Sequence, residues 1–152
     1  FVAIKNTYTN AKLVIIGRGP YEKKMKNLIK KLRLEKHVTL MGWLPRDQYL
    51  KELATTCVFL MPSEYECYGI AVAEAIAMGV PTVVANSAAL GMYVKHKLAL
   101  GIHPPITAER ISIAVCNALE TTWIRSSDSL RQVVIAWDEV VKRLETIYKE
   151  QY

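Results

Sequence analysis

The sequence predicts an α/β protein with a doubly wound, Rossmann-like parallel sheet covered by helices on both faces, a three-layer α/β/α arrangement. Short apolar runs recur along the chain, and they are continuous rather than alternating, which is typical of parallel strands buried on both faces. A polar or glycine-containing turn and a segment of helical periodicity follow most of these runs. The 152 residues, 51% of them hydrophobic, suit one domain with a single core, so we treat residues 1–152 as that domain.

The first third of the chain contains two strand–turn–helix units. Residues 11–17 (AKLVIIG) predict a strand, and a helix begins near Pro20, a residue favoured at the first helical position. Residues 36–43 (KHVTLMGW) predict a second strand, which leads through the loop LPRDQ into a two-turn helix over Gln48–Ala54. The chain opens on residues 1–17 as if within a fold, without a charged-then-apolar leader, so we expect a fragment of a longer protein.

Gly17 and Gly19 punctuate the turn after the first strand. A dinucleotide-binding fingerprint requires a third glycine three residues after Gly19, where this chain has Glu22, so the sequence argues against a nicotinamide or flavin site. Two interpretations of the glycines remain open. They form a tight strand-to-helix turn, or they let the backbone approach a phosphate or a ribose.

A strand–loop–helix–strand unit dominates the centre of the sequence. Its buried strand, polar loop, helix, glycine turn and second buried strand are predicted over residues 57–61, 62–67, 68–78, 79 and 81–85. Ligands of open parallel sheets bind at the carboxyl ends of the strands, so the loop lies where chemistry is expected. The loop carries Glu64 and Glu66, and Glu74 follows on the second helical turn. We expect Glu66 and Glu74 to face one crevice.

The last third predicts a small-residue loop over residues 86–94, a short strand within 96–105, and a helix with Thr107 as its N-cap. Two further helices follow, of which the second is the terminal helix 137–152. Its predicted apolar face consists of Val140, Val141, Leu144, Ile147 and Tyr148.

The start of the central helix offers backbone amides that lack intrahelical partners, at Cys67, Tyr68, Gly69 and Ile70. They can bind an anion or hydroxyl oxygens at the positive end of the helix dipole. Glu66 and Glu74 can accept hydrogen bonds from vicinal hydroxyls, such as those of a sugar or a ribose. Two alternatives stay open: the glutamates act as an acid/base pair, or Glu66 caps the helix and Glu74 lies on its polar face. A metal site would need further oxygen or imidazole ligands, so we expect no metal.

The net charge of +6 is concentrated in residues 21–37 (YEKKMKNLIKKLRLEKH). This segment predicts an amphipathic helix whose lysines could meet anionic lipid head groups or nucleic acid. The plainer interpretation is a solvated outer helix. Three cysteines without a CxxC pair favour a reducing, cytoplasmic setting, and no apolar run is long enough to span a membrane.

Residues 66–84 (ECYGIAVAEAIAMGVPTVV) resemble the donor-binding signature of the retaining GT-B glycosyltransferases of family 4, with two glutamates separated by seven residues. The likeness continues, in the same order, through LVIIGRGP, KHVTLMGWLP, CVFLMPSEYE and WDEVVKRLETIYKE. It implies one half of a GT-B fold. This half would be the carboxyl-terminal, nucleotide-sugar-binding domain of an enzyme that transfers a hexosyl group to an acceptor hydroxyl with retention.

The resemblance also implies roles for individual residues. Glu66 would bind hydroxyls of the donor sugar and is the residue assigned to catalysis, and Glu74 would bind the ribose. The donor-binding set is Glu66, Cys67, Tyr68, Gly69, Ile70 and Glu74, the nucleobase pocket is Met41, Gly42 and Trp43, and the loop near the nucleotide holds Gly17 and Gly19. Trp43 either stacks on the base or is a packed surface aromatic.

Two departures from the family pattern affect the site. The arginine and lysine with which the family binds the diphosphate precede the strand at residues 11–17, outside this sequence, and Arg18 belongs to a different motif. Met92 falls near the place of a glutamate that the family often has. We therefore expect this chain alone to bind donor weakly and to catalyse nothing.

The implied partners are a nucleoside-diphosphate sugar and a saccharide or lipid-linked acceptor, the latter bound by a missing amino-terminal domain. No cofactor and no nucleic acid are expected, and a cytoplasmic enzyme with a peripheral membrane contact is compatible with the basic segment. Two other classes remain open: a stand-alone nucleotide-sugar-binding module or non-catalytic subunit, and a basic nucleic-acid-binding module.

Overall fold

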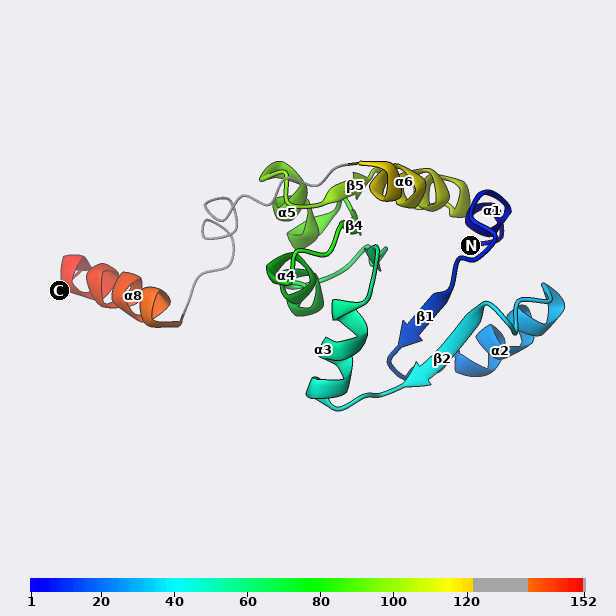
Figure 1. Cartoon of the computed structure of the whole chain (residues 1–152). Coiled ribbons are helices and arrows are strands. Elements are labelled where there is room, and N and C mark those ends of the chain that lie inside the picture. The colour runs from blue at the N-terminus through cyan, green and yellow to red at the C-terminus, as the bar shows by residue number, and fades with distance from the viewer. Residues whose placement is uncertain (122–136, 152) are drawn as a thin grey trace.

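The computed structural model describes residues 1–121 and 137–151, and Figure 1 shows the chain as an alternation of helices and parallel strands. The strands are β1 (Leu13–Ile16), β2 (Val38–Gly42), β3 (Phe59–Met61), β4 (Thr82–Ala85) and β5 (Leu100–Ile102). The helices are α1 (Val2–Thr7), α2 (Glu22–Lys31), α3 (Arg46–Ala54), α4 (Ile70–Ala77), η1 (Ala88–Leu90), α5 (Gly91–Lys95), α6 (Ala108–Glu120) and α8 (Trp137–Gln151). The α/β class predicted from the sequence is confirmed.

All five strands are parallel, but they form two sheets, with the orders β1-β2 and β3-β4-β5. The parallel, helix-flanked Rossmann-like arrangement predicted from the sequence is confirmed, with its strands paired as these two sheets. A doubly wound sheet has the order 3-2-1-4-5-6. The observed orders correspond to parts of such a sheet, and in the described part of the chain β1 and β3 each have a strand partner on one edge.

Strand β4 is the centre of the three layers, since all four of its residues are buried. Val84 packs with Val72 and Ile76 of α4 and with Leu90 and Tyr93 at one face. Val83 packs at the other face in a second cluster, formed with Ile4, Ile102, Val115 and Ala118 of α1, β5 and α6. Adjacent residues of a strand point to opposite faces, so one continuous apolar run supplies both halves of the core.

Several predicted elements are found with shifted ends. Helix α4 begins at Ile70 rather than Tyr68, and α3 begins at Arg46 rather than Gln48. The loop expected over residues 86–94 instead folds into η1 and α5, because its apolar residues Leu90 and Tyr93 are completely buried and fix the backbone. Thr107 caps α6 as predicted, with its Oγ1 accepting from the Arg110 amide at 3.2 Å.

The basic segment forms α2, which buries none of its residues, and Leu28 remains 54% exposed. The terminal helix α8 is also amphipathic, and its apolar face is exposed, including Val141, Leu144, Ile147 and Tyr148. The helix predicted ahead of α8 lies outside the described residues. Within the described ranges, no helix is both long enough and apolar enough to cross a membrane.

Residues of α5 and η1 contact the loop before α4 and hold it in place. Tyr93 is fully buried, and its hydroxyl donates to the Tyr68 carbonyl at 3.1 Å, with the two rings in an edge-to-face arrangement. Burial raises the pKa of Tyr93 far above its usual value, so the hydroxyl stays a donor. Gly69 is buried in a left-handed conformation, with a φ of +75°, and a Cβ there would lie 2.6 Å from Cδ2 of Leu90. Packing against Leu90 therefore requires a glycine at this position, whatever binds at the loop.

The unpaired edges of β1 and β3 lead to a hydrogen-exchange prediction. The amides of Leu13 and Phe59 donate to His37 and Pro81 across the observed ladders, each at 2.8 Å. Alternation turns the amides of Val14 and Leu60 to the opposite, unpaired edges. We expect these two amides to exchange at least about tenfold faster than those of Leu13 and Phe59. Equal protection in amide exchange monitored by NMR would mean that another strand pairs with these edges.

Replacing Gly69 with alanine should destabilise the fold. The left-handed backbone and the contact with Leu90 together should lower the free energy of unfolding by about 2 kcal/mol or more. Gly19→Ala is the matched control, because a Cβ at Gly19 meets nothing within 4 Å and should change stability by less than about 0.5 kcal/mol. Urea unfolding measures both, and equal stabilities for the two variants would contradict the packing described here.

Candidate functional site

The amino-terminal end of α4 presents unpaired backbone amides at the carboxyl edge of the three-stranded sheet. Gly69 is the N-cap, and the first helical bond runs from the Ala73 amide to the Gly69 carbonyl at 3.0 Å. The amides of Ile70, Ala71 and Val72 are thus the first of the helix, and this set begins three residues later than the sequence suggested. Ile70 is 69% exposed, which keeps this end of the helix close to solvent. Hydroxyl or anionic oxygens can bind here.

Glu66 lies half-buried at the end of the loop that follows β3. No side chain caps α4, so the alternative in which Glu66 caps this helix is wrong. Within the described chain, Glu66 forms no hydrogen bond or ion pair, which leaves both carboxylate oxygens available as acceptors. Cys67 and Tyr68, the next two residues, are exposed beside it.

Glu74 lies on the second turn of α4 and is only 17% exposed. Its Oε1 accepts a hydrogen bond from Nη1 of Arg46, the first residue of α3, and the two side chains form an ion pair. Tyr49, one turn further along α3, packs in a cluster with Leu53 and Ala75. Glu74 therefore belongs to a contact between two helices and does not simply lie on a solvated polar face.

The Tyr49 hydroxyl lies in the same contact. It is buried and, among the described side chains, has no hydrogen-bond partner of adequate geometry. Burial raises the pKa of Tyr49 above its usual value, and the nearby negative charge of Glu74 raises it further, while Arg46 has a smaller opposite effect. Arg46 and Tyr49 thus flank the Glu74 carboxylate.

The residues predicted for a nucleobase pocket lie at the carboxyl end of β2. Met41 and Gly42 are half-buried, and Trp43 is 67% exposed, so its ring is accessible for stacking. The Arg18 side chain covers Gly42, with Nε 3.6 Å from the place of a Cβ on that glycine. The loops that follow β1 and β2 are therefore adjacent.

The glycines of the first turn have open surroundings. A Cβ on Gly17 or Gly19 would meet no atom within 4 Å, so packing does not require either glycine. Gly17 has a φ of +126°, which favours glycine, and its amide donates to the Gly42 carbonyl at 2.7 Å. The tight-turn interpretation thus accounts for Gly17, and the open space above both glycines remains compatible with a ligand.

A shallow hollow of about 500 Å³ lies at the same edge of the three-stranded sheet. The first half of the loop after β3 lines it together with a residue that follows β5: Pro62, Ser63, Glu64, Tyr65 and Ile106. Ser87 holds this loop, since its Oγ donates to the Glu64 carbonyl at 3.0 Å. Neither Glu66 nor Glu74 lines the hollow. In the described residues, no group of three or more His, Cys, Asp or Glu is arranged to hold a metal ion.

The sequence analysis singles out Glu66 and Glu74 but not the side chains that contact Glu74 or support the loop. Arg46 precedes Glu74 by 28 positions, and neither its loop nor its helix carries a motif that marks it. Tyr93 and Leu90, which support the loop and Gly69, lie in the segment 86–94 that the sequence predicts as a loop. The periodic apolar spacing of Leu90, Tyr93 and Val94 was the signal for a buried helix there.

Comparison with known proteins assigns the chain to a family. The family model "Glycosyl transferases group 1" matches residues 1–132. An uncharacterized glycosyltransferase of Methanocaldococcus jannaschii is 29% identical over 146 residues, which cover 92% of this chain and 37% of the relative. A GDP-mannose-dependent alpha-(1-6)-phosphatidylinositol monomannoside mannosyltransferase of Mycobacterium tuberculosis is 30% identical over 124 residues, covering 77% of this chain and 32% of the relative. The chain thus spans about a third of the length of these relatives.

Solved structures agree on the fold. A sucrose-phosphate synthase from Thermosynechococcus elongatus superimposes with a TM-score of 0.77 at 20% identity, covering 99% of this chain and 41% of that one. The pneumococcal O-GlcNAc transferase in complex with UDP and GlcNAc gives 0.73 at 15% identity, covering 98% and 31%. Both are glycosyltransferases of the GT-B fold, whose halves are Rossmann-like α/β domains. The chain belongs to the glycosyl transferases group 1 family.

Proposed function

We propose that this chain is the nucleotide-sugar donor-binding domain of a retaining glycosyltransferase that transfers a hexosyl group to an acceptor hydroxyl. The observation that carries the proposal is the arrangement around α4. An unpaired Glu66, a helix start of free amides and a largely buried Glu74 follow one another at the carboxyl edge of a parallel sheet. Family membership and the likeness to a transferase crystallised with UDP and GlcNAc support it.

Each part of the site has a task in this proposal. Glu74 accepts hydrogen bonds from the ribose hydroxyls, and the amides that begin at Ile70 bind oxygens of the sugar and of the diphosphate region. Trp43 and its neighbours take the nucleobase. Glu66 binds hydroxyls of the sugar that is transferred. No metal and no cofactor are part of the proposed site.

Transfer itself is proposed for the longer protein. The bond between the anomeric carbon and the diphosphate oxygen breaks and its electrons leave with the nucleoside diphosphate. The acceptor oxygen forms its bond to the anomeric carbon on the same face and gives its hydroxyl proton to the departing phosphate oxygen. Stabilising the negative charge of the departing diphosphate is the main electrostatic task, to which the amides of α4 contribute. A second domain would bind a saccharide or lipid-linked acceptor and close over the donor, which excludes water. We assign the enzyme to the cytoplasm, where its free cysteines stay reduced.

The first test measures nucleotide binding. Isothermal calorimetry with UDP, GDP and ADP should show binding of at least one of them to the wild-type chain. Glu74→Ala should weaken that binding about tenfold, equivalent to about 1.4 kcal/mol, because a charged acceptor of the ribose hydroxyls is lost. Unchanged affinity would remove Glu74 from the site, and the absence of binding by all three nucleotides would sink the proposed function.

The second test separates the sugar from the nucleotide. Glu66→Gln keeps the size of the side chain and removes the charge, so it should weaken binding of the nucleotide-sugar severalfold and leave binding of the free nucleoside diphosphate unchanged. Competition titrations with UDP-, GDP- and ADP-sugars against their diphosphates measure the difference. Glu64→Gln, in the same loop, is the matched control. Equal losses for sugar-bearing and sugar-free ligands would place Glu66 at the nucleotide instead.

A further inference from the structure

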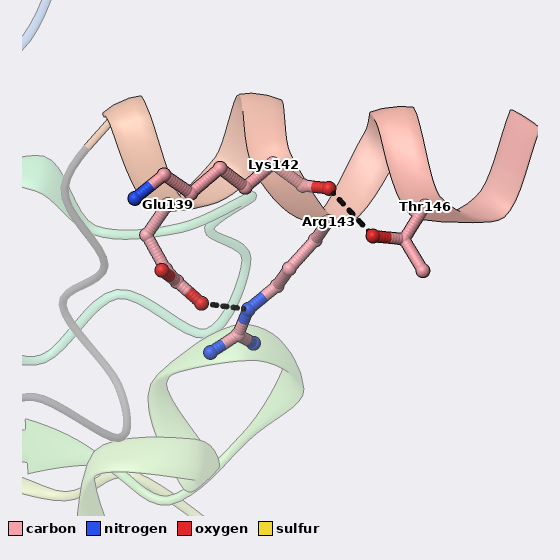
Figure 2. Close-up of polar contacts among 4 residues, drawn as sticks. All are labelled: Glu139, Lys142, Arg143 and Thr146. Carbon is pink, nitrogen blue, oxygen red and sulfur yellow. Dashed lines mark hydrogen bonds and ion pairs between the residues drawn. The ribbon is translucent and has the colours of Figure 1, made fainter. Parts of the chain in front are cut away.

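The ion pair between Arg46 and Glu74 differs from the other described ion pairs. Glu22–Lys26 and Glu139–Arg143 are contacts four residues apart on the surface of one helix, and Figure 2 shows the second of them, at 3.1 Å, on α8. Such pairs contribute little to a fold. Arg46 and Glu74 instead join two helices across 28 residues of sequence.

Apolar packing already fixes the two helices that this pair connects. Leu53 is 3% exposed and Ala75 is completely buried, and they form one cluster with Val80 and Tyr49 between α3 and α4. Arg46, Tyr49 and Leu53 are spaced at three and four residues, so they share one face of α3. Arg46 is itself 72% exposed and adds little to the stability of this contact. Its place beside Glu74 is therefore a consequence of the packing, and a role for the pair in holding the helices together is unnecessary.

The pair with Arg46 uses only one of the two carboxylate oxygens of Glu74. Arg46 engages Oε1, and among the described residues no ion pair or hydrogen bond of adequate geometry engages Oε2. A carboxylate held at one oxygen by a guanidinium has a defined orientation, and its second oxygen still accepts hydrogen bonds. The buried Tyr49 hydroxyl on the same face limits where else the carboxylate can turn. Nothing comparable orients Glu66.

Arg46 also begins the helix directly after the loop that carries Trp43. Arg46 therefore links the Trp43 loop, which is proposed to bind the nucleobase, to Glu74, which is proposed to bind the ribose. A base and its ribose are covalently joined, so their two binding sites must keep a fixed separation. Packing of α3 on α4 keeps that separation, and Arg46 at the start of α3 can fix the orientation of the Glu74 carboxylate within it.

We propose that Arg46 is a positioning residue for nucleotide recognition: it orients the Glu74 carboxylate so that Oε2 meets the ribose hydroxyls. This inference rests on the proposed function of the site and adds a determinant of ribose recognition to it. Arg46 acts through Glu74 and does not bind the nucleotide itself. If Arg46 instead donated hydrogen bonds to the diphosphate or the base, its replacement would weaken binding of ribonucleotides and dideoxynucleotides alike. The experiment below distinguishes the two cases.

The test compares ribose with a sugar that lacks its hydroxyls. The probes are whichever of UDP, GDP and ADP binds, and its 2′,3′-dideoxy counterpart, titrated by calorimetry into the wild type and the variants. The wild type should prefer the ribonucleotide about tenfold. Arg46→Gln should reduce this preference to about threefold or less while leaving the affinity for the dideoxy nucleotide unchanged. Arg46→Lys keeps the charge and loses the planar donor geometry, so its preference for ribose should lie between those of the wild type and of Arg46→Gln.

The double variant gives the sharper result. Glu74→Ala should abolish the preference for ribose, and adding Arg46→Gln to it should have no further effect, because Arg46 acts only through Glu74. Arg143→Gln, which removes an arginine from an exposed pair on α8, is the matched control and should behave as the wild type. Thermal unfolding of Arg46→Gln should match that of the wild type, as expected for an exposed side chain.

Three results would overturn the inference. Tighter binding by Arg46→Gln would mean that Arg46 competes with the nucleotide for Glu74. An equal loss of affinity for ribose and dideoxyribose would mean that Arg46 contacts the base or the phosphates directly. A preserved preference for ribose in Arg46→Gln would mean that Glu74 needs no positioning. In each case the proposed function of the site still stands, whereas a wild type that binds no nucleotide removes both.

Discussion

Burial of β4 on both faces is the constraint on which the rest of this structure depends. Its four residues are completely enclosed, with Val84 packed against α4 and α5 and Val83 packed against α1 and α6. A strand enclosed in this way has no freedom to slide, since a shift of one residue would exchange its two faces. Helix α4 packs on it through Val72 and Ile76 and takes its position from it. The loop over residues 62–67 precedes that helix, so it lies beside this buried part of the molecule.

The apolar scaffold and the polar site are joined at a few residues. Gly69 turns the chain into α4 with a left-handed backbone, and Leu90 fills the space that a side chain there would need. The buried Tyr93 hydroxyl donates a hydrogen bond to the carbonyl of Tyr68. Every group above this support, from Glu66 to Ile70, is wholly or partly accessible except Gly69 itself. Buried packing on one side of this loop and accessible polar groups on the other is the arrangement expected of a site that is formed before its ligand arrives.

The sequence predicted the fold class, the five strands and the central loop–helix unit because buried parallel strands leave continuous apolar runs. The segment 86–94, which contains η1 and most of α5, was not predicted as helical, since its small residues resemble a loop and only Leu90 and Tyr93 are fully buried. The pairing of strands into two sheets could not be predicted, because pairing depends on which edges meet in space. Glu66 and Glu74 could be identified by their position relative to a strand end. Arg46 could not, because its partner lies far away in sequence and the contact exists only after α3 packs on α4.

The account makes one central claim, that the end of α4 and the loops around it bind a nucleotide-sugar. Amide chemical shifts recorded while UDP-, GDP- and ADP-sugars are added to the isotopically labelled chain test it most directly. The account predicts that the largest changes fall on Gly69 to Val72, with further changes at Gly42 and Trp43. Changes confined to the lysine-rich helix α2, with the start of α4 unaffected, would contradict it.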